Sequence, residues 1–223
     1  MSSAALQIIA LVTMLIDHIG YRIFPGVEPL RWIGRISFPL FAFMLVEGFI
    51  HTKGRWRYLG RLTLFAAISE IPYKIFSRGG RWWLHIWGEP LWNNVFFELM
   101  LIFIAVWSIQ AALEKNKLFF VLTGLCLVLA GLMGTMYGVY GILMGICFYI
   151  FRKDRLLAAA CLIALTILYC LQNWSLFQIW AILAAVPIWF YNGKRGQRLP
   201  KYFGYIFYPA HLLVICAIHG LIA

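Results

Sequence analysis

The chain has 223 residues, of which 63% are hydrophobic and only 12% are charged. Soluble domains have roughly 45–50% apolar and about 25% charged residues, so this composition excludes an ordinary soluble fold. The formal net charge of +11 would suit nucleic-acid binding, but nothing else in the sequence supports that class, and no nucleic-acid partner is expected. We therefore expect a protein that crosses a membrane several times.

A membrane-spanning helix needs about 20 mostly apolar residues. The sequence predicts an all-α bundle of about nine transmembrane helices that forms a single domain over residues 1–223. The first helix is expected to be retained, because no basic residue precedes it and no small-x-small cleavage site follows it. The expected spans cover residues 4–24, 31–51, 58–77, 92–112, 118–134, 137–151, 156–172, 175–191 and 202–222. The fifth to eighth are short, and two of them could instead pair as a re-entrant unit.

Basic residues gather in alternate loops between these spans. The groups are Lys53, Arg55, Arg57 and Arg61; Lys115 and Lys117; Arg152, Lys153 and Arg155; and Lys194, Arg195, Arg198 and Lys201. Cytoplasmic loops of membrane proteins collect Lys and Arg. The pattern therefore predicts a cytoplasmic N-terminus and a C-terminus on the outer side. On that outer side the segment "SRGGRWWLHIWGEPLW" (77–92) carries four tryptophans, which predicts either a lid or an anchor at the membrane interface.

The first span, "LVTMLIDHIGYRIFP", holds an acid and an imidazole side by side. Such groups cost free energy at membrane depth and usually face a protein interior or a water-filled cavity. At about 100° per residue, Gln7, Asp17, His18, Tyr21 and Arg22 fall within an arc of roughly 140°. The helix therefore has one polar face, which we expect to point into the bundle.

Other polar residues of the expected spans divide into two groups. Those predicted near the outer side are Arg31, Arg35, Glu70, Asn94 and Glu98, while Glu47 and His51 lie four residues apart near the cytoplasmic side. Several of these could instead form structural ion pairs or a helix-end pair. Pro39 is expected to kink or restart the second span. In the last span Tyr208 and His211 flank Pro209, and His211 could bond a backbone carbonyl that the proline frees.

His18 is the candidate general base, because a buried histidine near a carboxylate can take a proton from a nucleophile. Neighbouring helical residues point about 100° apart. The partner of His18 is therefore open between Asp17, Glu70 and Glu98. No metal site is predicted, since the five cysteines lie in apolar runs without the spacing of metal ligands. The glycines of "GLMGTMYGVYGILMG" (131–145) favour close helix packing or a tight turn.

Six stretches, taken in order, resemble the TraX family. They are "LIDHIGYRIFP", "LRWIGRISFPLFAFMLVEGFIHT", "AISEIPYKIF", "NNVFFEL", "YGVYGILMG" and "YIFYPAHLLVI". The family is named for a membrane protein that acetylates the N-terminal alanine of F-pilin, and it is similar to the broader class of transmembrane acyltransferases. The resemblance implies a multi-pass protein of the bacterial cytoplasmic membrane that transfers an acetyl group from cytosolic acetyl-CoA.

The resemblance also implies roles for the polar groups. Glu47, His51 and the basic loop that includes Lys53, Arg55 and Arg57 would bind acetyl-CoA. His18 would act as base, with Asp17 or Glu70 holding its tautomer. The oxyanion and the acceptor would meet Arg31, Arg35, Asn94 and Glu98. The acceptor is open between a pilin or other peptide, a glycan and a lipid. The alternatives are a proton-coupled transporter that uses the Asp, His and Glu cluster as a relay, and a membrane assembly factor.

Overall fold

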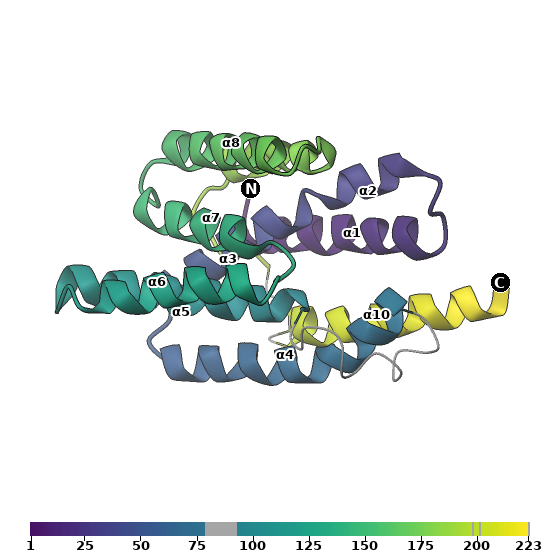
Figure 1. The fold of residues 1–223 in the computed structure, drawn as a ribbon, viewed down its shortest axis with the longest axis horizontal. Coiled ribbons are helices and arrows are strands. Elements are labelled where there is room, and N and C mark those ends of the chain that lie inside the picture. The colour runs from purple at the N-terminus through teal and green to yellow at the C-terminus, as the bar shows by residue number, and fades with distance from the viewer. Residues whose placement is uncertain (79–92, 198, 201, 223) are drawn as a thin grey trace.

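The computed structural model describes residues 1–78, 93–197, 199–200 and 202–222, and every regular element in those ranges is helical (Figure 1). The first half holds α1 (Ser3–Arg22), α2 (Glu28–Gly34), α3 (Ser37–His51), α4 (Arg55–Arg78) and α5 (Val95–Glu114). The second half holds α6 (Phe119–Leu132), α7 (Gly138–Ile150), α8 (Arg155–Gln172), the 3-10 helix η2 (Phe177–Ala184), α9 (Ala185–Trp189) and α10 (Phe203–Ile222). Most of the tryptophan-rich stretch 77–92 lies outside the described residues, so the lid or anchor stays a prediction.

Each of the nine expected spans falls on one helix or on two consecutive helices. Five of these segments in the described part are long and apolar enough to cross a membrane: Ser3–Arg22, Glu28–His51, Val95–Glu114, Arg155–Gln172 and Phe203–Ile222. α4 has the length but carries several charged residues, and the apolar segments Phe119–Leu132, Gly138–Ile150 and Phe177–Trp189 are shorter. The all-helical class is confirmed, while the count of nine spans and their orientation stay predictions.

The helices α1, α4, α5, α6, α8 and α10 run roughly along the long axis of the molecule (Figure 1). α1 packs against α2, α3 and α10, and α5 packs against α3, α4, α6 and α7. α3 and α5 supply many of the fully buried side chains, among them Leu40, Phe49, Ile102 and Phe103. In Figure 1, α1, α2, α7 and α8 form the upper part of the bundle, and α4, α5, α6 and α10 form the lower part. Of the polar face of α1, Asp17 contacts Arg31 and Arg35 at α2. His18 of the same face contacts His211 of α10, whereas Tyr21 is exposed.

The second expected span breaks as its proline suggested. α2 ends at Gly34 and α3 begins at Ser37, so Pro39 occupies the first turn of the new helix, where the missing N–H breaks no helical bond. The break lets α2 turn back onto α1 while α3 continues into the core. It thereby directs Arg31 and Arg35 toward α1.

The glycine-rich stretch forms both a turn and a packing surface. Gly134 and Gly138 each have φ of +58°, a conformation that side-chain-bearing residues avoid, in the connection from α6 to α7. A Cβ atom on Gly145 would overlap Ile102 of α5, so α7 can approach α5 closely only without that side chain. Both predicted roles of these glycines are therefore realised.

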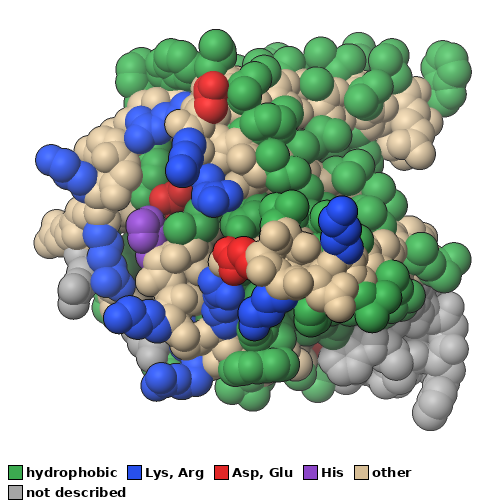
Figure 2. All heavy atoms as spheres, turned by 90° about the vertical axis from the view of Figure 1, so that its left-hand side faces the viewer, with side chains coloured by type: hydrophobic (Ala, Val, Ile, Leu, Met, Phe, Trp, Pro, Cys, Tyr) green, Lys and Arg blue, Asp and Glu red, His purple; other side chains and the backbone are tan. Residues whose placement is uncertain are grey.

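The described members of the four basic groups lie at one end of the bundle, which we call the basic end. The connections α3–α4, α5–α6 and α7–α8 all turn there, on the left of Figure 1. The backbone amides of Ser3 and Ala4 donate to the carbonyls of Lys194 and Arg195 at 2.9 and 3.0 Å, which brings the fourth group and the start of α1 to the same end. Figure 2 shows Lys and Arg side chains spread over this face.

Candidate active site

The side chains of His18 on α1 and His211 on α10 meet inside the bundle, although 193 residues separate them. His18 Nδ1 lies 2.6 Å from His211 Nε2, and the two rings are stacked with centroids 4.9 Å apart. His211 is 6% exposed, and its Nδ1 lies 2.7 Å from the carbonyl oxygen of Phe207. Among the described residues, this imidazole takes the place that we expected a carboxylate of Asp17, Glu70 or Glu98 to fill.

This chain of contacts fixes the tautomers when both rings are neutral. A carbonyl oxygen only accepts, so His211 Nδ1 carries the proton and donates it to Phe207. His211 Nε2 is then an acceptor, and His18 Nδ1–H donates to it. The lone pair of His18 is left on Nε2. The second imidazole accepts from His18 Nδ1–H, as the aspartate of a Ser-His-Asp triad accepts from its histidine, and it holds the His18 ring in one orientation.

Asp17 has a different set of partners from His18. Its Oδ1 lies 2.7 Å from Arg35 Nη2 and 3.3 Å from Arg31 Nε, and its residue is 6% exposed. A Cβ atom on Gly34 would overlap the Asp17 side chain, so α2 reaches α1 because this position is glycine. Two guanidinium groups share one carboxylate, which leaves one positive charge in excess beside His18.

His18 and the arginine pair border a pocket of about 210 Å³, whereas His211, the partner of His18, is not in its wall. The ring of Phe76 meets His18 edge-on with centroids 4.9 Å apart, and Tyr137 stacks on Phe38 at 3.6 Å. The side chains that form its wall include Asp17, His18, Tyr21, Arg31, Arg35, Phe38, Phe76, Tyr137 and Tyr208. The pocket thus combines a base, a positive charge and aromatic walls, which is what a reaction that develops negative charge on an oxygen requires.

The predicted outer residues Glu70 and Asn94 lie near this pocket but not in its wall. Asn94 Nδ2 donates to Glu70 Oε2 at 2.8 Å and to the carbonyl of Ala66 at 2.9 Å, while its Oδ1 caps α5. Lys74 Nζ lies 3.4 Å from Glu70. In the described part, these contacts tie α4 to α5 rather than reaching His18.

Glu98 is fully buried elsewhere. Its Oε2 accepts from the Tyr137 amide at 3.4 Å, at the start of α7, where a helix N-terminus favours an anion. A Cβ atom on Gly141 would overlap its Oε1. Glu98 therefore supports the turn that carries Tyr137 and does not contact His18.

At the basic end lies a second, larger pocket of about 570 Å³. We call it the donor pocket, after the acetyl donor that the family resemblance implies for Glu47 and His51. Glu47 and His51 are in its wall, with their side chains 3.7 Å apart, and Tyr191 donates to Glu47 at 3.1 Å. Among the described residues, the arginines in the wall are Arg61 and Arg195. The predicted Lys53, Arg55 and Arg57 are not in it.

The contacts of Arg55 show why this predicted residue is not in the wall of the donor pocket. Its guanidinium sits 4.5 Å above the Phe49 ring and 6.0 Å from that of Trp107, and neither of these rings is in the wall of the donor pocket. Arg61 lies six residues further along α4 and shares a face with Tyr58, three residues away. Arg55 lies at the same spacing from Tyr58, so no local spacing in the sequence selects Arg61 from the loop.

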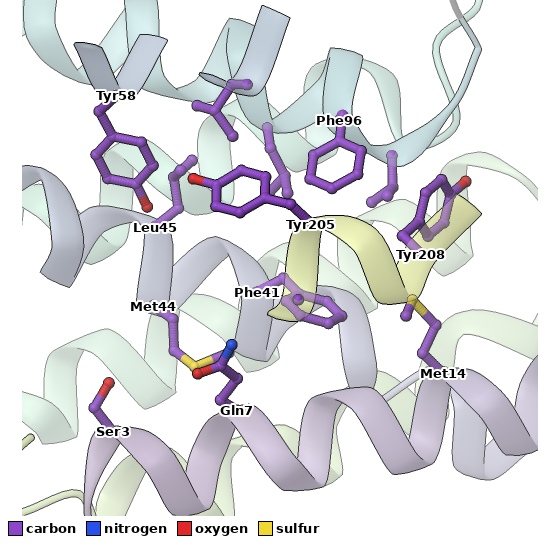
Figure 3. A pocket seen from close by; sticks show the side chains of 14 residues that line it. Ser3, Gln7, Met14, Phe41, Met44, Leu45, Tyr58, Phe96, Tyr205 and Tyr208 are labelled. Carbon is purple, nitrogen blue, oxygen red and sulfur yellow. The ribbon is translucent and has the colours of Figure 1, made fainter. Parts of the chain in front are cut away.

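A third pocket of about 220 Å³ lies between the other two (Figure 3). It shares Ser3, Gln7, Met44 and Tyr58 with the donor pocket. It shares Met14, Val95 and Tyr208 with the pocket of His18. Successive pockets therefore have common walls from the basic end to the His18–His211 pair, and we call the middle one the neck.

These features define the class: a helical membrane protein with a polar, histidine-containing site inside the bundle. A profile of the TraX protein family matches residues 2–219, and the chain belongs to that family. A probable fimbrial assembly protein FimC, serogroup H1, from Dichelobacter nodosus is 29% identical over 250 residues, which cover 97% of this chain and 95% of the relative. No solved structure matches the chain.

Proposed function

We propose that this protein is a membrane acetyltransferase that moves an acetyl group from cytosolic acetyl-CoA to an acceptor at the opposite end of the bundle. In this proposal the nine helices span a bacterial cytoplasmic membrane and the basic end faces the cytoplasm. The observation that carries it is the series of three adjoining pockets, which leads from a cationic mouth to an oriented histidine.

The dimensions of the series suit the pantetheine arm of CoA. Gln7, in the donor pocket wall, and His18 are eleven positions apart on α1, which corresponds to about 16 Å along the helix. The arm has about twelve bonds between its phosphate ester oxygen and its sulfur, which extend roughly 14 Å, and the thioester carbon adds about 2 Å. A nucleotide in the donor pocket would thus place its thioester at the level of His18.

The charges of the donor pocket suit the rest of the CoA molecule. Arg61 and Arg195 would meet its phosphates, since guanidinium groups bind phosphate through paired hydrogen bonds. Glu47 and His51 would lie at the polar groups of the nucleotide. In this proposal Lys53, Arg55 and Arg57 contribute to the positive field of the cytoplasmic face and not to the site.

The proposed reaction in the pocket of His18 follows from the tautomer of His18. The acceptor nitrogen or oxygen attacks the thioester carbon, and His18 Nε2 takes the proton of the acceptor as the new bond forms. Arg31 or Arg35 stabilises the negative charge on the carbonyl oxygen. The carbon–sulfur bond breaks, and the CoA thiolate takes the proton back from His18. His211 stabilises the transient imidazolium by accepting the hydrogen bond from Nδ1.

For the acceptor we propose a peptide amine. The resemblance to the TraX family implies a pilin acceptor, and the relative is described as a probable fimbrial assembly protein. The excess positive charge near His18 disfavours a protonated amine and favours the neutral, nucleophilic form. A hydroxyl acceptor on a glycan or lipid would use the same base.

The test is acetyl transfer by the purified protein in lipid nanodiscs. Radiolabelled acetyl-CoA is supplied with peptides whose N-terminus is free or blocked, and with a glycan and a lipid acceptor. We expect label on the free amine, loss of transfer in His18→Ala, and normal transfer in His219→Ala, which changes a histidine near the end of α10. Absence of transfer to every acceptor, or full activity of His18→Ala, would overturn the proposal.

A further inference from the structure

Gln7 is a polar residue in the apolar part of α1 that the chemistry at His18 does not use. An amide at membrane depth costs free energy unless it is hydrogen-bonded. Within the described part of the chain, no hydrogen bond joins the Gln7 side chain to another residue. The side chain is half-buried and belongs to the wall of both the donor pocket and the neck.

The surroundings of Gln7 direct its amide into the neck. Figure 3 shows the side chain rising from α1 beside Met44, with Phe41 and Tyr205 further along the pocket. A Cβ atom on Gly204 of α10 would lie 3.1 Å from Gln7 Nε2, so the glycine leaves room for the amide. The neighbours Met44 and Phe41 offer no strong hydrogen-bonding group. Among the described residues, three hydroxyl groups that also line the neck form no hydrogen bond with the amide, those of Ser3, Tyr58 and Tyr205. The amide is therefore available to a ligand in the neck.

The distance from Gln7 to His18 indicates which part of the proposed CoA molecule would lie beside Gln7. Gln7 lies about 16 Å along α1 from His18. The outer half of the pantetheine arm, which carries an amide and a hydroxyl group, lies roughly 9–16 Å from the thioester carbon. We propose that Gln7 is a recognition residue for this outer half of the arm, separate from the arginines that bind the phosphates. This inference rests on the proposed function, because it assumes that the neck holds CoA.

The experiment measures binding and needs no acceptor. Two probes are titrated into the protein in nanodiscs by calorimetry: CoA, and adenosine 3′,5′-bisphosphate, which has no arm. Gln7→Leu should weaken CoA binding roughly threefold to tenfold, the effect of one neutral hydrogen bond, and leave the affinity for the bisphosphate unchanged. Gly204→Ala, whose Cβ atom would crowd the Gln7 amide at 3.1 Å, should weaken CoA binding in the same selective way but by less. Arg61→Gln should weaken both probes.

The controls separate this inference from the proposed function. Gln172→Leu makes the same exchange at an exposed position outside the three pockets and should change neither affinity. If the unaltered protein binds neither probe, the proposed function fails. If it binds both and Gln7→Leu weakens neither, or weakens both equally, the role of Gln7 is overturned while the proposed function stands.

Discussion

The His18–His211 pair makes the sharpest prediction about catalysis. Replacing His211 by phenylalanine keeps a flat ring between Phe207 and His18 but removes the acceptor for His18 Nδ1–H. In the proposed transition state His18 is positively charged, and a hydrogen bond from a charged donor contributes about 1.5–3 kcal/mol. His211→Phe should therefore lower kcat roughly tenfold to 150-fold.

The assay is acetyl transfer from acetyl-CoA to the peptide amine, with kcat and KM measured separately. The KM for acetyl-CoA should stay within about twofold, because His211 does not touch the donor in this account. His211→Gln supplies an amide oxygen as acceptor and should recover part of the lost kcat. A wild-type kcat in His211→Phe would refute the reasoning, as would an equal loss in both variants.

Three further predictions concern the surroundings of the pair. Gly34→Val inserts a side chain into the position of Asp17 and should lower the free energy of unfolding by about 1–3 kcal/mol; an unchanged thermal midpoint in detergent would contradict this. Arg35→Met leaves buried Asp17 with Arg31 as its remaining guanidinium partner and should cost about 3 kcal/mol in the same measurement, whereas Arg35→Lys should cost less. Glu98→Gln keeps an acceptor for the Tyr137 amide, so acetyl transfer should stay within about threefold; a loss of transfer, or proton-driven uptake that this variant abolishes, would favour the transporter alternative.

The positions of most helices could be predicted from the sequence because their apolar runs are bounded by polar or glycine-rich stretches. The restart at Pro39 and the turn at Gly134 and Gly138 follow from backbone chemistry that acts locally. The same information does not settle how many segments cross the membrane. Charged residues at both ends of α4, and the short lengths of α6 and α7, leave their place in a bilayer undecided by composition.

The candidate site could be predicted only in part, because contacts between distant helices depend on packing. The polar residues of the first span indicated His18 and Asp17 as site candidates. The helix period also predicts that these two adjacent side chains point in different directions. The partner of His18 could not be predicted, because His211 lies on the last helix and nothing local links the two positions. A carboxylate is the partner of the histidine in Ser-His-Asp triads, which is why one was expected for His18. In this bundle the carboxylate of Asp17 instead pairs with Arg31 and Arg35.

The central claim is that a CoA molecule crosses the three pockets from the basic end to His18. A structure of the protein with bound CoA in nanodiscs tests it most directly. The account predicts nucleotide density beside Arg61 and Arg195, an arm that passes Gln7, and the sulfur within about 4 Å of His18 Nε2. Nucleotide density at the opposite end of the bundle, or an arm that leaves the neck empty, would contradict it.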